Sequence, residues 1–177
     1  LRAHAQRLTN GDTLSIGEGE GRNAVFLAGL GHKVTALDAS AAALAKAQKL
    51  AETRQVKIEV LHTSLASYDI AAARWDTVIS IFCHLPARMR QRIHQQIVQG
   101  LRPGGIFILE AYTPARLQYN TGGPPLAALM MDLSTLREEL AGLELIHAEE
   151  IIREINEGEL HNGMSAVVQV IARKKAE

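Results

Sequence analysis

The sequence predicts an α/β fold: a mostly parallel seven-stranded sheet with helices on both faces and an antiparallel hairpin at its C-terminal end. Short apolar runs alternate with helical patterns along most of the chain, which is typical of parallel strands joined by right-handed crossovers. A glycine-rich turn follows the first apolar run, and two long strand patterns around a polar turn close the chain. Strands joined that tightly must be antiparallel.

The first half of the chain shows strand and helix patterns in alternation. The expected elements are a short helix over 1–8, strands over 13–16, 33–38 and 58–61, and helices over 23–30 and from Ser40 to about Thr53. Gly31 follows the first long helix, as glycine commonly does at a helix end. Ser40 is a suitable N-cap for the Ala-rich helix, because its hydroxyl can accept a hydrogen bond from the first turn.

The second half begins with the same alternation and then changes. The expected elements are strands over 76–82 and 106–111, a helix from Pro86 to about Gln99, a loop over 112–125, a helix over 134–140, and strands over 143–155 and 164–172. The run over 76–82 is nearly all apolar, as expected for a strand covered on both faces. Pro86 suits the first turn of a helix. Pro103-Gly104-Gly105 separates that helix from the next strand.

Composition limits the class of protein. A chain of 177 residues, 47% hydrophobic and 21% charged, suits one domain over 1–177 with a substantial core. The formal net charge is zero and no block of lysine and arginine occurs, which argues against a nucleic-acid or membrane partner. No apolar run is long enough to span a bilayer. The single cysteine, Cys83, suits a reducing compartment, so we expect a cytoplasmic protein.

The glycine-rich turn indicates a nucleotide-type ligand site. Gly17, Gly19 and Gly21 follow the first strand in a G-x-G-x-G pattern, and a helix begins directly after them, so main-chain N–H groups can face a ligand. The dinucleotide pattern G-x-G-x-x-G would need glycine where Arg22 stands. Asp38 ends the second strand, where a carboxylate can accept hydrogen bonds from both ribose hydroxyls. That acid would equally serve NAD, or act only as a helix N-terminal acid.

These features together resemble the class I S-adenosylmethionine-dependent methyltransferases, which have a Rossmann-like fold. The resemblance covers the glycine turn, the acid after the second strand, the stretch Leu101-Arg102-Pro103-Gly104-Gly105 and the closing hairpin. Arg22-Asn23 directly after the turn is similar to the tellurite-resistance methyltransferase subfamily. The resemblance implies S-adenosylmethionine as cofactor and S-adenosylhomocysteine as product.

The resemblance also implies which residues bind the cofactor, segment by segment. Those residues are Gly17, Glu18, Gly19, Gly21 and Asn23 around the methionine part, Asp38 at the ribose, Ala39, Ser64 and Leu65 at the adenine, and Ile81 and Phe82 near the amino group. Ser15 stands where the family usually has an acid, and Glu18 would have to replace that acid from a different place in the loop. The family often has a lid before the first strand, which leaves room for a segment upstream of Leu1.

The acceptor is expected at the end of the fourth strand. His84 there would act as a general base or orient an acceptor, or would only bond the backbone. Cys83 is expected to be a small apolar filler. Four further residues would contact the acceptor, Arg88, Tyr112, Arg116 and Tyr119, unless the loop over 112–125 is only a solvated connector. Arg90 and Arg92 are expected on a solvated helix face. The seven histidines show no metal-ligand spacing, so we expect no metal.

The predicted function is methyl transfer from S-adenosylmethionine to a small thiol, amine, carboxylate or oxyanion by in-line displacement. The partner expected is therefore a small molecule, with the protein a monomer or weak homodimer. Two alternatives stay open, a non-catalytic S-adenosylmethionine-binding protein and an NAD-dependent oxidoreductase. A nucleic-acid methyltransferase is disfavoured, because Ser80-Ile81-Phe82-Cys83 stands where the amino-methylating enzymes carry [DN]-P-P-[FYW].

Overall fold

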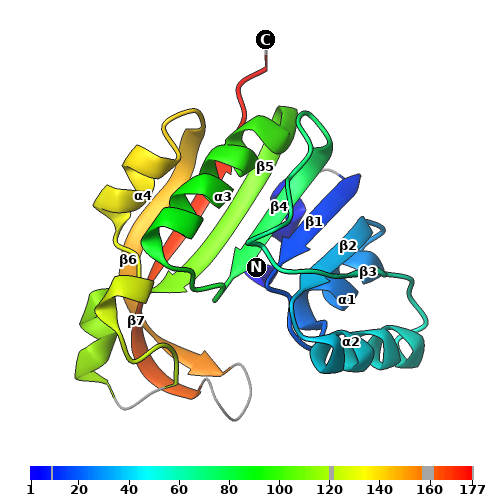
Figure 1. Ribbon diagram of the computed structural model, residues 1–177, viewed down its shortest axis with the longest axis horizontal. Helices are drawn as coiled ribbons and strands as arrows, with labels where there is room; N and C mark the ends of the chain where they lie inside the picture. The colour runs from blue at the N-terminus through cyan, green and yellow to red at the C-terminus, as the bar shows by residue number, and fades with distance from the viewer. Residues whose placement is uncertain (9, 120–121, 157–161, 177) are drawn as a thin grey trace.

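The computed structural model describes residues 1–8, 10–119, 122–156 and 162–176. In these residues seven strands form one sheet in the order β3-β2-β1-β4-β5-β7-β6 (Figure 1). The strands are β1 (Asp12–Ile16), β2 (Lys33–Asp38), β3 (Glu59–His62), β4 (Trp75–Ile81), β5 (Leu101–Tyr112), β6 (Glu144–Asn156) and β7 (Asn162–Arg173). Neighbours among β1 to β5 are parallel, and β7 runs antiparallel to both β5 and β6. The predicted fold class is confirmed.

Helices cover both faces of this sheet. They are α1 (Arg22–Gly29), α2 (Ala41–Thr53), α3 (Ala87–Gly100) and α4 (Leu133–Glu139), with short 3-10 turns η1 (Arg2–Arg7), η2 (Pro114–Gln118) and η3 (Ala127–Leu129). The N-cap predicted for α2 is present, since the Ala43 N–H donates to Ser40 Oγ (3.2 Å). Apolar residues of α1 and α2 share one buried cluster with β2. Those of α3 and α4 belong to a second cluster on the other face (Figure 1).

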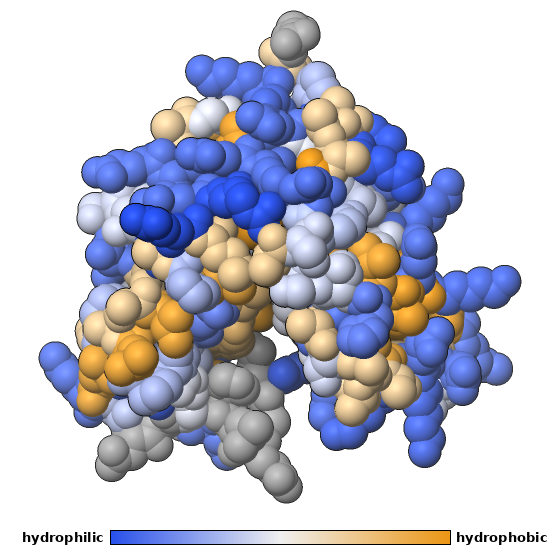
Figure 2. Space-filling model, viewed as in Figure 1, coloured by the Kyte–Doolittle hydropathy of each residue, from blue (hydrophilic) through white to orange (hydrophobic). Residues whose placement is uncertain are grey.

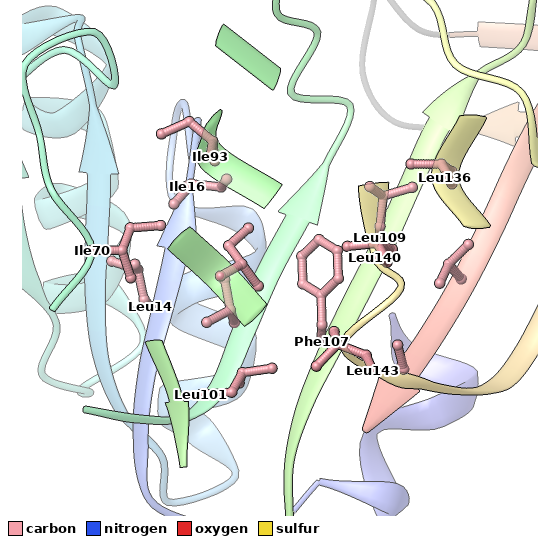
Figure 3. Packing of buried hydrophobic residues seen from close by; sticks show 14 of the residues in the cluster. Leu14, Ile16, Ile70, Ile93, Leu101, Phe107, Leu109, Leu136, Leu140 and Leu143 are labelled. Carbon is pink, nitrogen blue, oxygen red and sulfur yellow. The ribbon is translucent and has the colours of Figure 1, made fainter. Parts of the chain in front are cut away.

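The larger core lies between the sheet and the α3–α4 layer (Figure 3). Leu14 and Ile16 of β1 and Phe107 and Leu109 of β5 are two residues apart on their strands, so each pair points to the same face. Ile93 of α3 packs onto them with no exposed surface. Burying aliphatic side chains of this size stabilises the fold by about 1.5–3 kcal/mol each.

The largest difference from the predicted elements is the start of β5. That strand begins at Leu101 rather than Ile106, because the Pro-Gly-Gly stretch does not break it. Leu101 pairs with Trp75 of β4, and an irregularity in the β4 register follows. Gly104 has a φ of 80° and donates its N–H to the Lys174 carbonyl (2.8 Å). The stretch is therefore a distorted part of the strand.

Two smaller differences concern short segments. The predicted N-terminal helix is the 3-10 turn η1, and the predicted loop 112–125 contains the 3-10 turn η2. The polar turn predicted at Glu157-Gly158 lies outside the described residues.

The strand order fixes where a ligand site belongs. The chain leaves β1 toward β2 on one side, while β4 lies on the other side, so the connections diverge at the C-terminal ends of β1 and β4. In open α/β sheets ligands bind at such a switch point. Figure 2 shows the molecule hollowed below this edge, beside α2.

Candidate functional site

The three glycines of the turn after β1 have left-handed φ angles of 59°, 67° and 91° at Gly17, Gly19 and Gly21. A Cβ on Gly21 would lie 2.7 Å from Ala47 Cα, so this glycine permits close packing of the turn against α2. A Cβ on Gly17 would lie 2.7 Å from Cys83 Sγ, at the end of β4. Gly17 and Gly21 therefore allow the turn to pack closely against Cys83 and against helix α2.

Gly19 differs from the other two because, among the described residues other than its two chain neighbours, no atom lies within 4 Å of the position its Cβ would take. Packing within the protein therefore does not explain the glycine at this position. Its left-handed φ and its main chain bordering open space are the features that a ligand-binding turn requires.

Asp38 ties this turn to the start of α2. The Gly19 N–H donates to Asp38 Oδ2 and the Ser40 N–H donates to Oδ1, both at 2.8 Å. An ionised carboxylate has about four acceptor sites, so two contacts leave capacity for hydroxyl groups of a ligand. Asp38 also lies beside the open space over Gly19. A ribose in that space would contact both the main chain of the turn and the Asp38 carboxylate.

Glu18 occupies an unexpected position, with its carboxyl turned back into the protein. Oε1 accepts hydrogen bonds from the N–H groups of Asn23 (3.0 Å) and Ala24 (2.9 Å), and Oε2 accepts one from Ser15 Oγ. Burial raises the pKa of this carboxyl, although the three hydrogen bonds oppose the shift. A carboxyl therefore does reach Ser15, where the family usually has its acid, and it also caps the N-terminus of α1.

In the segment after β3, the two residues predicted to border the adenine differ in exposure. Leu65 is buried in the core, and its carbonyl accepts a hydrogen bond from the Arg92 guanidinium. Ser64 is exposed, and its Oγ accepts from the Ala66 N–H (3.1 Å). Sequence reasoning missed His62, whose Nε2 lies 3.1 Å from the Ala39 carbonyl oxygen. The sequence signal for it was its place directly after the predicted strand 58–61, and the structure pairs it with Asp38 across β2 and β3.

The predicted solvated face of α3 is wrong for Arg90, whereas Arg92 keeps 36% of its side chain exposed. Arg92 bonds Asp69 Oδ1 (3.3 Å) and the Ala66 carbonyl (3.2 Å) in addition to Leu65. Arg90 is 5% exposed and forms an ion pair with Glu139 of α4 (2.8 Å). Both side chains therefore hold helix α3 in place. Arg88, which was predicted near the acceptor, is exposed in the first turn of α3.

Aromatic rings gather at the C-terminal ends of β4 and β5. The ring centroid of Tyr112 lies 4.7 Å from that of Phe82 and 5.4 Å from that of His84, and the His84 and Tyr112 planes are 12° apart. Phe82 has a φ of 55°, which is strained for a non-glycine residue. Its N–H donates to the Glu110 carbonyl (2.7 Å). The chain thus turns sharply at the end of β4.

The Tyr112 main chain determines the tautomer of His84. The Tyr112 N–H donates to His84 Nε2 (3.1 Å), and a main-chain N–H can only be a donor. Nε2 must therefore carry a lone pair, and in the neutral ring the proton is on Nδ1. Of the roles predicted for His84, bonding the backbone is observed.

Arg116 and Tyr112, both predicted to contact an acceptor, are held by the loop after β5. Arg116 donates to the carbonyls of Gly122 (3.0 Å) and Pro124 (3.2 Å) and lies over the Tyr112 ring at 5.9 Å. Tyr112 has no exposed surface, and a Cβ on Gly123 would lie 2.5 Å from its ring. Tyr119 is half-buried, and its N–H donates to the Arg116 carbonyl (2.8 Å).

A cross-strand ion pair lies beside this aromatic group and was not predicted. Glu110 of β5 is buried, and its Oε1 accepts from Arg153 Nε of β6 (2.7 Å) and from Gln169 Nε2 of β7 (2.9 Å). The three residues come from three adjacent strands, and Arg153 and Gln169 lie 43 and 59 positions after Glu110 in the sequence. Local sequence patterns cannot show such a group.

Two structural features are absent from the described residues. In that part of the chain no cluster of three or more His, Cys, Asp or Glu side chains could hold a metal ion. None of the helices found there is both long and apolar enough to cross a membrane.

The sequence matches the profile of the protein family described as "Methyltransferase domain" over residues 13–105, which is more than half of the chain. It is 31% identical over 130 residues to the 2-heptyl-1-hydroxyquinolin-4(1H)-one methyltransferase of Mycobacteroides abscessus, an alignment covering 70% of this chain and 56% of that protein. A probable S-adenosylmethionine-dependent methyltransferase of Mycolicibacterium smegmatis is 27% identical over 67% of this chain and 44% of its own length. The chain thus spans about half the length of these curated relatives.

Solved structures share the fold at lower identity. TehB from Haemophilus influenzae superposes with a TM-score of 0.82 at 20% identity, covering 98% of this chain and 61% of TehB. A SAM-dependent methyltransferase from Methanosarcina mazei superposes with a TM-score of 0.79 at 19% identity, covering 100% of this chain and 99% of the other.

Proposed function

Because this chain belongs to the family of class I methyltransferase domains, we propose that it transfers a methyl group from S-adenosylmethionine to a small-molecule acceptor. S-adenosylmethionine is the cofactor that this family and fold imply. The observation that carries the proposal is the open space over the Gly19 main chain, beside the Asp38 carboxylate and at the switch between β1 and β4. The residues present therefore fit the cofactor.

We assign the binding roles as follows. Asp38 accepts the ribose hydroxyls, and the main chain of Gly17, Gly19 and Gly21 lies along the methionine part. Ala39, Ser64 and Leu65 border the adenine, the last through its main chain because its side chain belongs to the core. The main chain of Ile81 and Phe82 lies near the amino group. Glu18 and Asn23 act indirectly, because their hydrogen bond holds the shape of the turn.

The main task of the protein in this reaction is to position the cofactor and the acceptor. When bound, S-adenosylmethionine supplies a methyl group on a positively charged sulfur, which is already activated toward a nucleophile. The chain has to hold an acceptor in line with that methyl group and keep water away, and such positioning can supply several kcal/mol of a barrier. The aromatic group at the ends of β4 and β5 suits this purpose, because the partly exposed Phe82 and His84 rings are backed by the fully buried Tyr112 ring.

A small planar acceptor is the class that we propose. The relative in Mycobacteroides abscessus is named for a hydroxyquinolinone substrate, and the partly exposed Phe82 and His84 rings at this site suit a flat ring of that kind. We further propose that residues 1–177 form one domain and that the protein is a monomer or weak homodimer. We also propose that it is located in the cytoplasm and has no nucleic-acid partner.

The test is transfer of a labelled methyl group from S-adenosylmethionine to a panel of small acceptors with thiol, N-hydroxy, phenol, carboxylate and amine groups. We expect the protein to methylate at least one of them and Asp38→Ala to lose the activity. The control variant Asp12→Ala, at the N-terminal end of β1 and away from the glycine turn, should keep the activity. Binding of S-adenosylmethionine without transfer to any acceptor would favour the non-catalytic alternative. Preferential binding of NAD would favour an oxidoreductase.

A further inference from the structure

We propose that the site methylates acceptors whose O–H or S–H group is already ionised at the working pH, and that His84 is a positioning residue. This inference rests on the proposed methyl transfer and narrows its acceptor class. It excludes aliphatic alcohols, whose hydroxyl would have to lose its proton to the protein. It favours thiols, N-hydroxy heteroaromatics and acidic phenols.

His84 is the first residue to consider as a base, and its geometry opposes that role. In the neutral ring only one nitrogen can accept a proton, and here that nitrogen is Nε2. Nε2 already accepts the Tyr112 N–H at 3.1 Å. A proton added to Nε2 would point at the proton of that N–H, so protonation would break the contact between the ends of β4 and β5.

The other titratable side chains around the site are engaged in contacts within the protein. Cys83 Sγ packs against Gly17, and burial raises the pKa of this thiol to about 12. Glu18 accepts from Ser15 and from the first turn of α1. Asp38, on the cofactor side, accepts from Gly19 and Ser40.

The charged groups on β5, β6 and η2 are similarly engaged. Glu110 accepts from Arg153 and Gln169. Arg116 donates to two carbonyls of its own loop and lies over the Tyr112 ring. The described imidazole and carboxyl groups named above therefore each make a contact within the protein that would be disturbed if they took a proton from an acceptor.

An ionised acceptor removes the need for a base. Its oxygen or sulfur lone pair forms the new bond to the methyl carbon, the carbon–sulfur bond of the sulfonium breaks, and that electron pair stays on sulfur. The products are a methyl ether or thioether and the neutral thioether S-adenosylhomocysteine. Charge balances, since an anion and a cation give two neutral groups and no proton moves.

His84 then acts through Tyr112 rather than on the reacting atoms. Its hydrogen bond to the Tyr112 N–H and its stacking on the Tyr112 ring link the end of β4 to the end of β5. The same ring contacts Phe82, whose strained φ of 55° needs support from its surroundings. Loss of His84 should therefore misplace the acceptor without removing a titrating group.

The experiment measures kcat/KM for the acceptor against pH, with a series of substituted phenols and thiophenols of graded acidity and the full chain. For each acceptor, we expect the rate to rise with pH through the acceptor's own pKa, so the midpoint moves along the series. His84→Gln should lower kcat/KM by about tenfold and leave every midpoint unchanged. His84→Ala should lose more, because glutamine alone can still accept the Tyr112 N–H.

A single midpoint shared by all acceptors would overturn the inference, and its disappearance in His84→Gln would identify His84 as the base. Efficient methylation of an aliphatic alcohol would overturn it as well. These outcomes leave the proposed function intact. Failure to methylate any member at any pH, with S-adenosylmethionine bound, would instead overturn the proposed function and the inference with it.

Discussion

At the scale of single residues, Cys83 shows how position decides chemistry. The sequence places the only cysteine at the end of a strand beside a ligand site, where a thiol can be a nucleophile or a filler. In the fold its Sγ packs against Gly17, and burial raises its pKa to about 12 from 9.0. The thiolate is the reactive form, so this thiol is suited to packing.

We therefore predict that Cys83 resists alkylation. At pH 8 in the folded protein, iodoacetamide should modify it about a thousandfold more slowly than a free thiol, because the thiolate fraction falls tenfold per pKa unit. Mass spectrometry of timed samples measures the rate. Unfolding the protein in urea should restore rapid alkylation and serves as the control. Rapid alkylation of the folded protein would contradict this account.

Asp38 carries the second residue-scale prediction. It accepts hydrogen bonds from Gly19 and Ser40, and we assign it the ribose hydroxyls. Asp38→Ala should weaken S-adenosylmethionine binding at least tenfold, or about 1.4 kcal/mol. Isothermal titration calorimetry measures this, with Asp12→Ala as the matched control at the far end of β1. Unchanged affinity in Asp38→Ala would remove Asp38 from the ribose role.

At the scale of elements, the sequence predicted strands and helices well where the signal was local. Ser40 caps α2 as expected, because a serine before an Ala-rich run is a sufficient signal. The start of β5 was missed because Pro103-Gly104-Gly105 is typical of a break. In the fold, Gly104 bonds the distant Lys174, and a contact so far along the chain leaves no local pattern.

The link between α3 and α4 could not be predicted for the same reason. Arg90 and Glu139 are 49 positions apart, and both side chains are nearly fully buried, with 6% and 5% exposed. His94 Nδ1 lies 2.6 Å from the same carboxylate. An arginine in a polar helix pattern ordinarily indicates a solvated face, so only the packing of the two helices identifies this ion pair.

We predict that Glu139→Gln destabilises the protein by about 3–5 kcal/mol at neutral pH, because it leaves a buried guanidinium without its charge partner. Denaturant unfolding measures the change in free energy. Glu138→Gln, on the exposed neighbouring residue, should stay within about 0.5 kcal/mol of the natural protein. An equal effect of the two substitutions would contradict the assignment.

The same pair predicts a pH dependence. Burial alone would raise the pKa of Glu139, but hydrogen bonds from His94 and Arg90 outweigh it, and the pKa lies below its usual value of 4.5. A carboxyl with a lowered pKa stabilises the fold above pH 4.5 and loses that contribution as the pH falls through its folded pKa. The stability difference between the natural protein and Glu139→Gln should therefore shrink below pH 4.5. A difference that stays constant from pH 6 to pH 3 would contradict it.

At the scale of the whole molecule, the two halves of the site differ in how far they could be predicted. The residues of the proposed cofactor half could be predicted from short motifs, because Gly17 to Gly21 and Asp38 lie within one strand–helix–strand unit. The proposed acceptor half joins Phe82 and Tyr112, from two segments that lie far apart in the chain, and the Glu110–Arg153 ion pair beside them links two further distant positions. The direction of those side chains follows from packing, so the sequence named some of the residues and missed their arrangement.

The measurement that tests the central claim most directly is calorimetric titration of S-adenosylmethionine into the natural protein, Gly19→Ala and Gly104→Ala. Both glycines have left-handed φ angles, 67° and 80°, and neither Cβ would meet an atom within 4 Å in the part of the chain that the structure describes, chain neighbours aside. The two substitutions should therefore lower the free energy of unfolding by similar amounts, about 1–2 kcal/mol each. We predict that Gly104→Ala binds like the natural protein and that Gly19→Ala binds at least tenfold more weakly. Equal affinities for the two variants, or no binding to the natural protein, would contradict the account.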